Sequence, residues 1–293
     1  RYVVGTKRDP ASRGGSRFVH DQLRVGTVLQ LGAPRNHFAL HEEAAHTVLI
    51  PVRSFPADRV TQIDRMHVLT GRRVTVATAP VRRARFTTDG RGEVRFARGS
   101  GNDNVSKLYY RDARGSAWKL INDEAATDRL EIPLGFASDD RTAYLQVEQP
   151  KGPDAIVALD TATGQRTDLL RDDTVDPHSI IRDVAGRPVG ATYMKDRLVS
   201  RYFDEAAAPA RAQRMLEKAF PGQSVRMVSS TREGRLSLML VTSDRSPGDY
   251  YLFDHAAREA KLVFSRADWF DPAHSAPVRP VALTARGGLP LHG

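Results

Sequence analysis

Residues 133–164 read PLGFASDDRTAYLQVEQPKGPDAIVALDTATG, a stretch in which strand-like apolar runs alternate with turns rich in Asp and Gly. Short runs of this kind, bounded by turn residues, predict β-strands joined by tight turns. The same alternation recurs upstream in residues 85–121 and downstream in residues 231–264. We therefore expect the chain to be all-β from about residue 59 onward.

Two independent sets of turn residues give the length of the repeat. Acidic residues stand in the tight turns between apolar runs at Asp89, Asp139, Asp183 and Glu233, which lie 50, 44 and 50 residues apart. Thr-Gly pairs, whose glycine supplies the positive φ of a hairpin turn, lie 93 residues apart at Gly71 and Gly164. A period of about 45 residues with four short strands per unit is typical of a β-propeller. Residues 59–283 would then form a partial propeller of about five units, with a large β-sandwich as the alternative.

One segment departs from this pattern. Residues 205–220 predict a helix inserted between two repeats, with Met215, Leu216 and Phe220 on one side. The following Pro-Gly pair ends it.

The first 50 residues follow a different pattern. A strand-like run at Tyr2–Val4 is followed by a glycine-rich turn and a short helix that Ser16 would cap and Gly26 would end. Backbone N–H groups at Gly14, Gly15 and Ser16 could meet an anion at the start of this helix. The structural alternative is a common Gly-Gly turn with a Ser cap.

Composition excludes several classes of protein. Lys and Arg number 44 against 35 acidic residues, but the basic residues are scattered singly between acids, so no nucleic-acid partner is expected. No apolar run approaches the roughly 18 residues of a membrane-spanning helix, and no membrane partner is expected. The absence of cysteine excludes disulfides, thiolate metal sites, iron–sulfur clusters and a cysteine nucleophile.

Motifs for catalysis and metal binding are missing from the sequence. No G-x-S-x-G nucleophile turn occurs in it. His41 and His46 are five residues apart rather than the four of a zinc-binding helix, which turns the second imidazole about 140° away. Ser, His and Asp also occur close together at residues 176–179 and 271–275, but triad members meet through the fold, so such proximity carries no information. We expect no catalytic and no metal-binding residues.

Part of the N-terminal segment carries a family resemblance. KRDPASRGGSRFVHDQLRVG (7–26) and PRNHFAL (34–40) resemble the flavin-binding barrel of the phthalate-dioxygenase-reductase (vanillate demethylase reductase) family. That resemblance implies FMN phosphate binding by Gly14, Gly15 and Ser16. The family's Arg-x-Tyr-Ser flavin motif, its Gly-Gly-Ile-Gly nicotinamide-domain start and its four iron–sulfur cysteines do not occur here. We therefore expect no cofactor, and FMN only if this segment still acts as an oxidoreductase.

The remainder carries a second resemblance. NDNVSKLYYRD (102–112), residues 133–164, LRDDTVDPHSI (170–180), DRSPGDYYLFD (244–254) and residues 268–293 resemble the N-terminal β-propeller of prolyl-oligopeptidase-family serine peptidases, in the dipeptidyl/acylaminoacyl-peptidase-like branch. The final residues resemble the crossover into an α/β-hydrolase domain, with Gly287 where that family usually has Asp. The family's catalytic Ser, Asp and His would lie beyond Gly293.

Together these features predict a composite chain. We expect a reductase-like FMN-binding barrel fragment at 1–50, a junction at 51–58, propeller blades at 59–283 and the start of a missing α/β-hydrolase domain at 284–293. Because both ends interrupt recognisable patterns, the chain is expected to be a fragment.

The leading hypothesis for function is a non-catalytic propeller of a serine peptidase that limits access to short peptides. Its partners would be the missing hydrolase domain and short peptides, in the cytoplasm or periplasm. The alternatives are a remnant of an FMN-dependent, NAD(P)H-linked oxidoreductase and a propeller that serves as a protein-interaction module. Whether the chain is itself an enzyme stays open.

Overall fold

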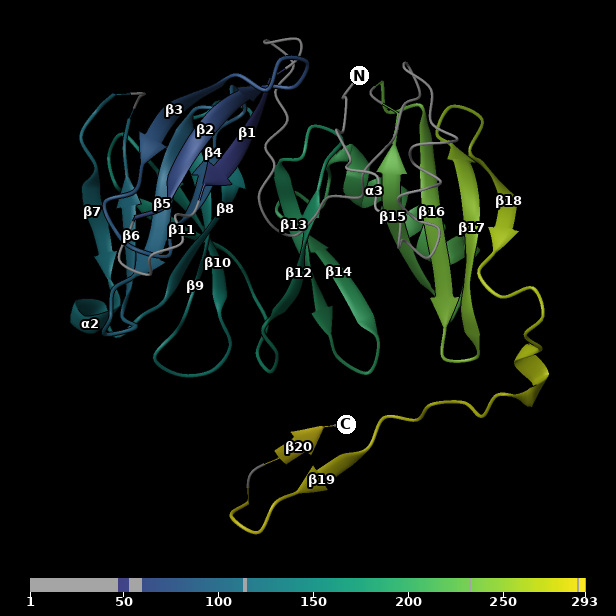
Figure 1. Cartoon of the computed structure of the whole chain (residues 1–293). Coiled ribbons are helices and arrows are strands. Elements are labelled where there is room, and N and C mark those ends of the chain that lie inside the picture. The colour runs from purple at the N-terminus through teal and green to yellow at the C-terminus, as the bar shows by residue number, and fades with distance from the viewer. Residues whose placement is uncertain (1–46, 53–59, 113–114, 232, 289, 293) are drawn as a thin grey trace, which may run out of the picture. The chain divides into compact units, whose positions relative to one another are not determined.

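The computed structural model describes residues 47–52, 60–112, 115–231, 233–288 and 290–292 (Figure 1). The chain divides into two compact units. The first takes in the described residues up to Leu145 and Asp160–Gly164, and the second takes in Gln146–Leu159 and the described residues from Gln165 onward. The expected N-terminal strand and helix, with Gly14, Gly15, Ser16, His41 and His46, lie outside the described residues.

Antiparallel sheets in which each strand pairs with its neighbour in sequence make up the fold. The first sheet contains β1 (Thr47–Val52), β2 (Gln62–His67) and β3 (Arg73–Thr78). The second contains β4 (Arg85–Thr88), β5 (Val94–Ser100), β6 (Ser106–Tyr110) and β7 (Lys119–Asp123), and the short helix α2 (Glu124–Thr127) follows it. The third contains β8 (Glu131–Phe136), β9 (Thr142–Val147), β10 (Ala155–Asp160) and β11 (Arg166–Arg171).

The third sheet contributes residues to both units, and the sheets that follow it lie wholly in the second unit. The fourth contains β12 (Pro177–Arg182), β13 (Pro188–Met194) and β14 (Leu198–Tyr202). After helix α3 (Ala208–Ala219), the fifth contains β15 (Ser224–Ser230), β16 (Leu236–Ser243), β17 (Ser246–Asp254) and β18 (Glu259–Ser265). A 3₁₀ turn η1 (Pro272–His274) and a hairpin of β19 (Ala282–Thr284) and β20 (Pro290–His292) complete the described chain.

The predicted repeat is confirmed by the positions of its turn residues. Each acidic residue lies in the turn between the first two strands of its sheet: β4–β5, β8–β9, β12–β13 and β15–β16. Gly71 and Gly164, at φ of 70° and 76°, join the last two strands of their sheets. Two of the five sheets have three described strands rather than the expected four.

The core consists of side chains that alternate along the strands. Leu49, Ile63 and Ala77 of the first sheet pack with Val94 of the second, and these four are at most 5% exposed. Because β1 pairs with β2 over its whole length, Thr47–Ile50 form part of this sheet although the sequence placed them at the end of the reductase-like segment. The domain boundaries remain a prediction.

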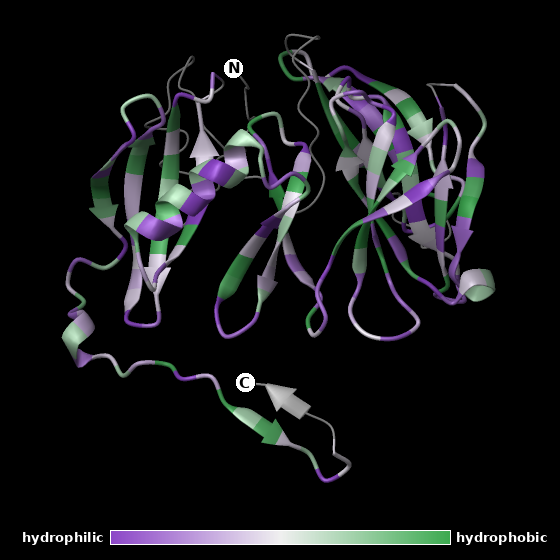
Figure 2. Ribbon diagram, turned by 180° about the vertical axis from the view of Figure 1, so that it is seen from behind, coloured by the Kyte–Doolittle hydropathy of each residue, from purple (hydrophilic) through white to green (hydrophobic). Residues whose placement is uncertain are grey.

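Helix α3 lies within the segment for which a helix was predicted. Leu216 is 3% exposed and packs with Val225, Met239 and Phe253 of the fifth sheet. Figure 2 shows α3 against this sheet, with hydrophobic and hydrophilic residues alternating along it. The expectation for Met215 is wrong, because it is 37% exposed: adjacent helix positions differ by about 100°, so only Leu216 and Phe220 share the packed face. Within the described residues, no helix is long and apolar enough to cross a membrane.

Candidate functional site

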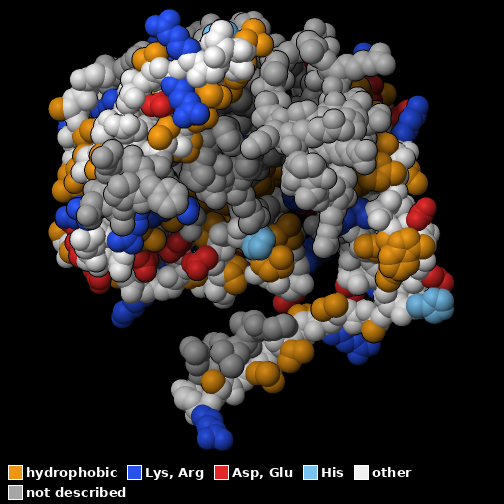
Figure 3. Space-filling view, in the orientation of Figure 1, with side chains coloured by type: hydrophobic (Ala, Val, Ile, Leu, Met, Phe, Trp, Pro, Cys, Tyr) orange, Lys and Arg blue, Asp and Glu red, His pale blue; other side chains and the backbone are white. Residues whose placement is uncertain are grey.

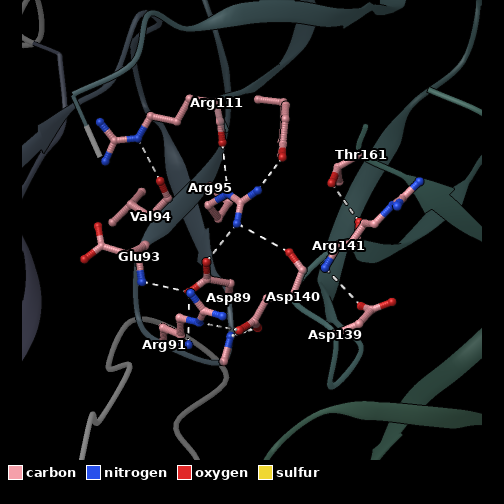
Figure 4. A network of polar contacts seen from close by, with 12 residues as sticks. Asp89, Arg91, Glu93, Val94, Arg95, Arg111, Asp139, Asp140, Arg141 and Thr161 are labelled. Carbon is pink, nitrogen blue, oxygen red and sulfur yellow. Dashed lines mark hydrogen bonds and ion pairs between the residues drawn. The ribbon is translucent and has the colours of Figure 1, made fainter. Parts of the chain in front are cut away.

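A network of buried charges lies at the turn between β4 and β5 (Figure 4). Asp89 Oδ1 accepts hydrogen bonds from the backbone N–H groups of Arg91 (3.1 Å) and Glu93 (2.9 Å), which closes the turn. Its Oδ2 pairs with Arg95 Nη1 at 2.9 Å, and the two side chains are only 3% and 11% exposed. Asp89 and Gly90 therefore form the turn, and the Asp89 carboxylate also holds the Arg95 guanidinium in place.

Arg95 is bonded on every side (Figure 4). Its Nε donates to the carbonyl of Arg111 at 3.0 Å, its Nη1 also to the carbonyl of Asp140 at 3.4 Å, and its Nη2 to the Tyr110 hydroxyl. The guanidinium lies 5.3 Å from the ring centres of both Tyr110 and Phe136. Burial by itself lowers the pKa of Arg95, but the bonds to Asp89 and Tyr110 outweigh it and raise that pKa above its usual value.

A second buried arginine stands beside the first. Arg111 is 4% exposed, and its Nε donates to the carbonyl of Val94 at 2.7 Å. Its guanidinium lies 4.7 Å from the centre of the Trp118 ring, a cation–π distance. Both arginines thus tie β5 and β6 together through backbone carbonyls.

Asp140 joins two successive repeats. Its Oδ1 accepts a 2.6 Å hydrogen bond from the N–H of Gly90, and its Oδ2 lies 3.3 Å from Arg91 Nε. A Cβ added at Gly90 would lie 2.8 Å from the same oxygen, so a side chain here would force the Asp140 carboxylate to shift. Gly90 and Asp140 are 50 residues apart, which is the spacing measured between the two turns.

The equivalent turns repeat the same use of aspartate. Asp139 Oδ1 accepts from the N–H of Arg141 and Thr142, and Asp183 Oδ1 accepts from the N–H of Ala185 and Arg187. The Arg187 Nε also donates to Asp183 Oδ2 at 2.8 Å, which parallels the pair at Asp89.

In the last repeat a threonine hydroxyl also contributes to the turn. Thr231 Oγ1 accepts from the N–H of Leu236 at 3.1 Å there.

This network can hold strands in place but offers no reactive group. Its carboxylates accept from backbone N–H groups and guanidinium groups, and its arginines stay protonated. It is therefore a rigid support of the kind on which loops carry function. Sequence reasoning placed Asp89 and Asp139 in turns but missed Arg95, Arg111 and Asp140, because their partners lie on other strands.

The two Ser-His-Asp groups in the sequence assemble no triad. Asp176 Oδ1 accepts from the Asp154 N–H at 2.8 Å, Ser179 Oγ lies 2.7 Å from Thr192 Oγ1, and His178 is exposed.

At the second group, His274 Nδ1 lies 3.4 Å from Asp271 Oδ2 on an exposed turn, with the imidazole 85% exposed.

Another serine and histidine do meet. Ser237 Oγ of β16 lies 2.7 Å from His255 Nε2, a contact that their 18-residue separation did not suggest. Ser237 is 1% exposed, so the pair is a core hydrogen bond out of reach of a substrate. Among the residues that the structure describes, no group of three or more His, Asp or Glu could hold a metal ion.

Sequence comparison finds two kinds of relative for two parts of the chain, and no family model matches it. Dipeptidyl aminopeptidase BIII of Pseudoxanthomonas mexicana is 25% identical over 233 residues, 78% of this chain and 33% of that protein. Phenoxybenzoate dioxygenase subunit beta of Ectopseudomonas oleovorans is 54% identical over 50 residues, 17% of this chain and 16% of that protein. Vanillate O-demethylase oxidoreductase of Pseudomonas putida is 49% identical over 49 residues, which are 17% of this chain and 16% of that protein. The chain thus spans a third or less of these relatives.

Solved structures confirm the fold class. Puromycin hydrolase superposes with a TM-score of 0.54 at 13% identity, covering 88% of this chain and 43% of that one. Prolyl oligopeptidase B from Galerina marginata superposes with a TM-score of 0.53 at 10% identity, covering 84% of this chain and 36% of that one. The fold is all-β and propeller-like, similar to the propellers of these enzymes.

Proposed function

We propose that this chain is the propeller portion of a serine peptidase, that it works together with an α/β-hydrolase domain, and that it limits access to short peptides. The observation that carries the proposal is the 233-residue similarity to dipeptidyl aminopeptidase BIII, a length that matches the repeated sheets. Loops at one end of radially arranged blades form a rim that can exclude larger molecules.

The buried charges support this use. A filter by size needs blades that keep their spacing, and the Asp140–Gly90 bond joins the turns of two successive sheets. Because Arg95 and Arg111 bond to backbone carbonyls, they hold the strands themselves and not only side chains. The network is therefore suited to a support whose loops meet the substrate.

An assay of the chain alone tests the non-catalytic part of the proposal. We expect no turnover of chromogenic aminoacyl or dipeptidyl substrates, because none of the Ser-His-Asp groups of the described residues forms a triad. Turnover that a serine-directed inhibitor abolishes would contradict the proposal. Turnover that resists the inhibitor would point to a contaminating peptidase of another class, which a second purification step would remove.

The N-terminal similarity favours a second candidate function. The 54% identity over 50 residues supports a remnant of a flavin-dependent oxidoreductase, in which Gly14, Gly15 and Ser16 would bind the FMN phosphate. Purified chain incubated with FMN and desalted would then keep the yellow absorption of flavin, and Ser16→Ala would weaken retention. A colourless wild-type chain would contradict this candidate and leave the first one untouched.

A further inference from the structure

Two arginines of the first unit face each other without an acidic partner. Arg85 of β4 and Arg98 of β5 are directly paired in the antiparallel register, which places their side chains on the same face of the sheet. Arg85 is exposed and Arg98 is partly buried. Within the described residues, neither guanidinium has a hydrogen bond or an ion pair, whereas Arg95 and Arg111 both donate to backbone carbonyls.

The opposed positive charges of Arg85 and Arg98 destabilise the pairing of β4 and β5 when no ligand is bound. Like charges directly opposite each other on neighbouring strands destabilise the pairing, and a partly buried charge needs a partner. Burial lowers the pKa of Arg98, and the charge of Arg85 lowers it further. Residues that weaken a fold in this way are common where a ligand supplies the missing interaction.

The nearby carboxylate of Glu124 does not fully neutralise the pair. The charge of Glu124 raises the pKa of Arg98, but burial and the charge of Arg85 together outweigh it, so Glu124 offsets the pair only in part.

A third arginine close by in sequence adds positive charge. Arg83 donates to Asn104 Oδ1 and to the carbonyl of Gly101. Both acceptors are neutral, so they leave the positive charge of Arg83 in place.

We propose that Arg85 and Arg98 bind a carboxylate group of a peptide. Guanidinium groups match the planar geometry of a carboxylate and form paired, charge-assisted hydrogen bonds with it. Two such groups on one face of adjacent strands can approach one carboxylate from two sides. That the carboxylate belongs to a peptide rests on the proposed function, whereas the site itself rests on the arginines alone.

Titration of the full chain with small peptides at low ionic strength tests the site. We expect N-acetyl-dialanine with a free carboxylate to bind, and its amide to bind about tenfold more weakly or worse. Arg85→Gln, at an exposed position, should weaken carboxylate binding by a similar factor. Arg197→Gln, which removes an exposed arginine of the β13–β14 turn, is the matched control and should bind as the wild type does. Equal binding of acid and amide, or unchanged binding by Arg85→Gln, would overturn the proposal.

Thermal melting gives a second readout that a structural role would not produce. Arg98→Met should melt at a higher temperature than the wild type without ligand, and the peptide acid should no longer shift its melting temperature. A lower melting temperature with the shift retained would overturn the site.

Two further ligands identify the source of the anion. N-acetyl-glutamate amide, with only a side-chain carboxylate, should shift the wild-type melt if the site takes any peptide carboxylate. A larger shift by inorganic phosphate than by either peptide would overturn the carboxylate assignment. Turnover in the peptidase assay would refute the proposed function without affecting these binding results.

Discussion

Asp89 and Arg95 form a pair in which each charge depends on the other. The side chains are 3% and 11% exposed, so removal of one leaves the other buried without its charged partner. We predict that Arg95→Met lowers the free energy of unfolding by about 3 kcal/mol, as measured by urea denaturation. The double variant Asp89→Asn/Arg95→Met should lose less than the sum of the two single variants.

Arg91 provides the control for this pair. Its side chain is 77% exposed and its contact with Asp140 is at the surface, so Arg91→Met should cost about 1 kcal/mol or less. Equal losses for Arg91→Met and Arg95→Met would show that the buried network does not stabilise the sheet.

Asp172 makes the stability of the fold depend on pH in the acid range. Its side chain is 1% exposed, and Lys195 Nζ lies 2.9 Å from Oδ2. Burial by itself raises the pKa of Asp172, but hydrogen bonds from Lys195 and Thr174 outweigh it and lower that pKa to about 2. Because the folded-state pKa lies below the unfolded one of about 3.9, the stabilisation is present above that value and is lost as the pH falls toward 2.

We therefore predict a pH-dependent difference between wild type and Asp172→Asn. At neutral pH the variant should be about 2 kcal/mol less stable, and the difference should vanish near pH 2. Asp173→Asn changes the exposed neighbouring residue and should follow the wild type throughout. A difference that stays constant across this range would show that the carboxylate charge is not what stabilises the fold.

At the residue scale, the sequence predicts turns better than partners. Asp89 and Asp139 could be placed because an acidic residue before a tight turn bonds its own backbone, which is a local effect. Asp140 could not be assigned to Gly90, because that contact is made across one repeat of the chain. The opposition of Arg85 and Arg98 likewise depends on strand register, which the spacing of apolar residues leaves open.

Among the secondary-structure elements, α3 allows a test with two adjacent residues. Leu216 is buried against the fifth sheet, whereas Met215 is 37% exposed. We predict that Leu216→Ala costs about 2–4 kcal/mol of unfolding free energy, and that Met215→Ala costs less than about 1 kcal/mol. Chemical denaturation of both variants checks this. Similar losses for the two would mean that α3 packs through another face.

The elements themselves were largely predictable. Strands and their turns repeat in sequence, so every acidic turn marker fell between the first two strands of a sheet. The assignment of Met215 to the packed face failed because a short apolar cluster does not fix the rotation of a helix to within one residue.

On the scale of the whole molecule, the fifth sheet presents exposed apolar side chains. Leu252, Leu262 and Phe264 are 39%, 57% and 51% exposed, and Figure 3 shows hydrophobic side chains at the surface along β17 and β18. Edge strands with exposed apolar residues favour association between chains. We predict concentration-dependent self-association in sedimentation velocity, which Phe264→Lys should reduce.

Leu283→Lys serves as the control, because Leu283 is exposed on β19, away from this sheet in sequence. A monodisperse monomer at all concentrations would contradict the prediction. A sharp calorimetric transition alongside it would also argue against incompletely covered sheets.

The two resemblances could be predicted because each part of the chain keeps its own motifs. The resemblances of the N-terminal segment and of the repeated sheets to different protein classes are confirmed by the relatives found for each. Where one part gives way to the other could not be derived, since β1 pairs continuously with β2 while lying at the end of the reductase-like segment.

The length of the peptides that a paired hydrolase domain accepts tests the central claim most directly. In a chimera, residues 60–265 would replace the matching region of dipeptidyl aminopeptidase BIII, with cleavage of a dipeptidyl chromogenic substrate as evidence of folding. For each enzyme, selectivity is the kcat/KM for this short substrate divided by the kcat/KM for a long denatured polypeptide. We predict that the selectivity of the chimera exceeds that of the isolated hydrolase domain by about tenfold or more. An active chimera with the same ratio as the isolated hydrolase domain would contradict the account.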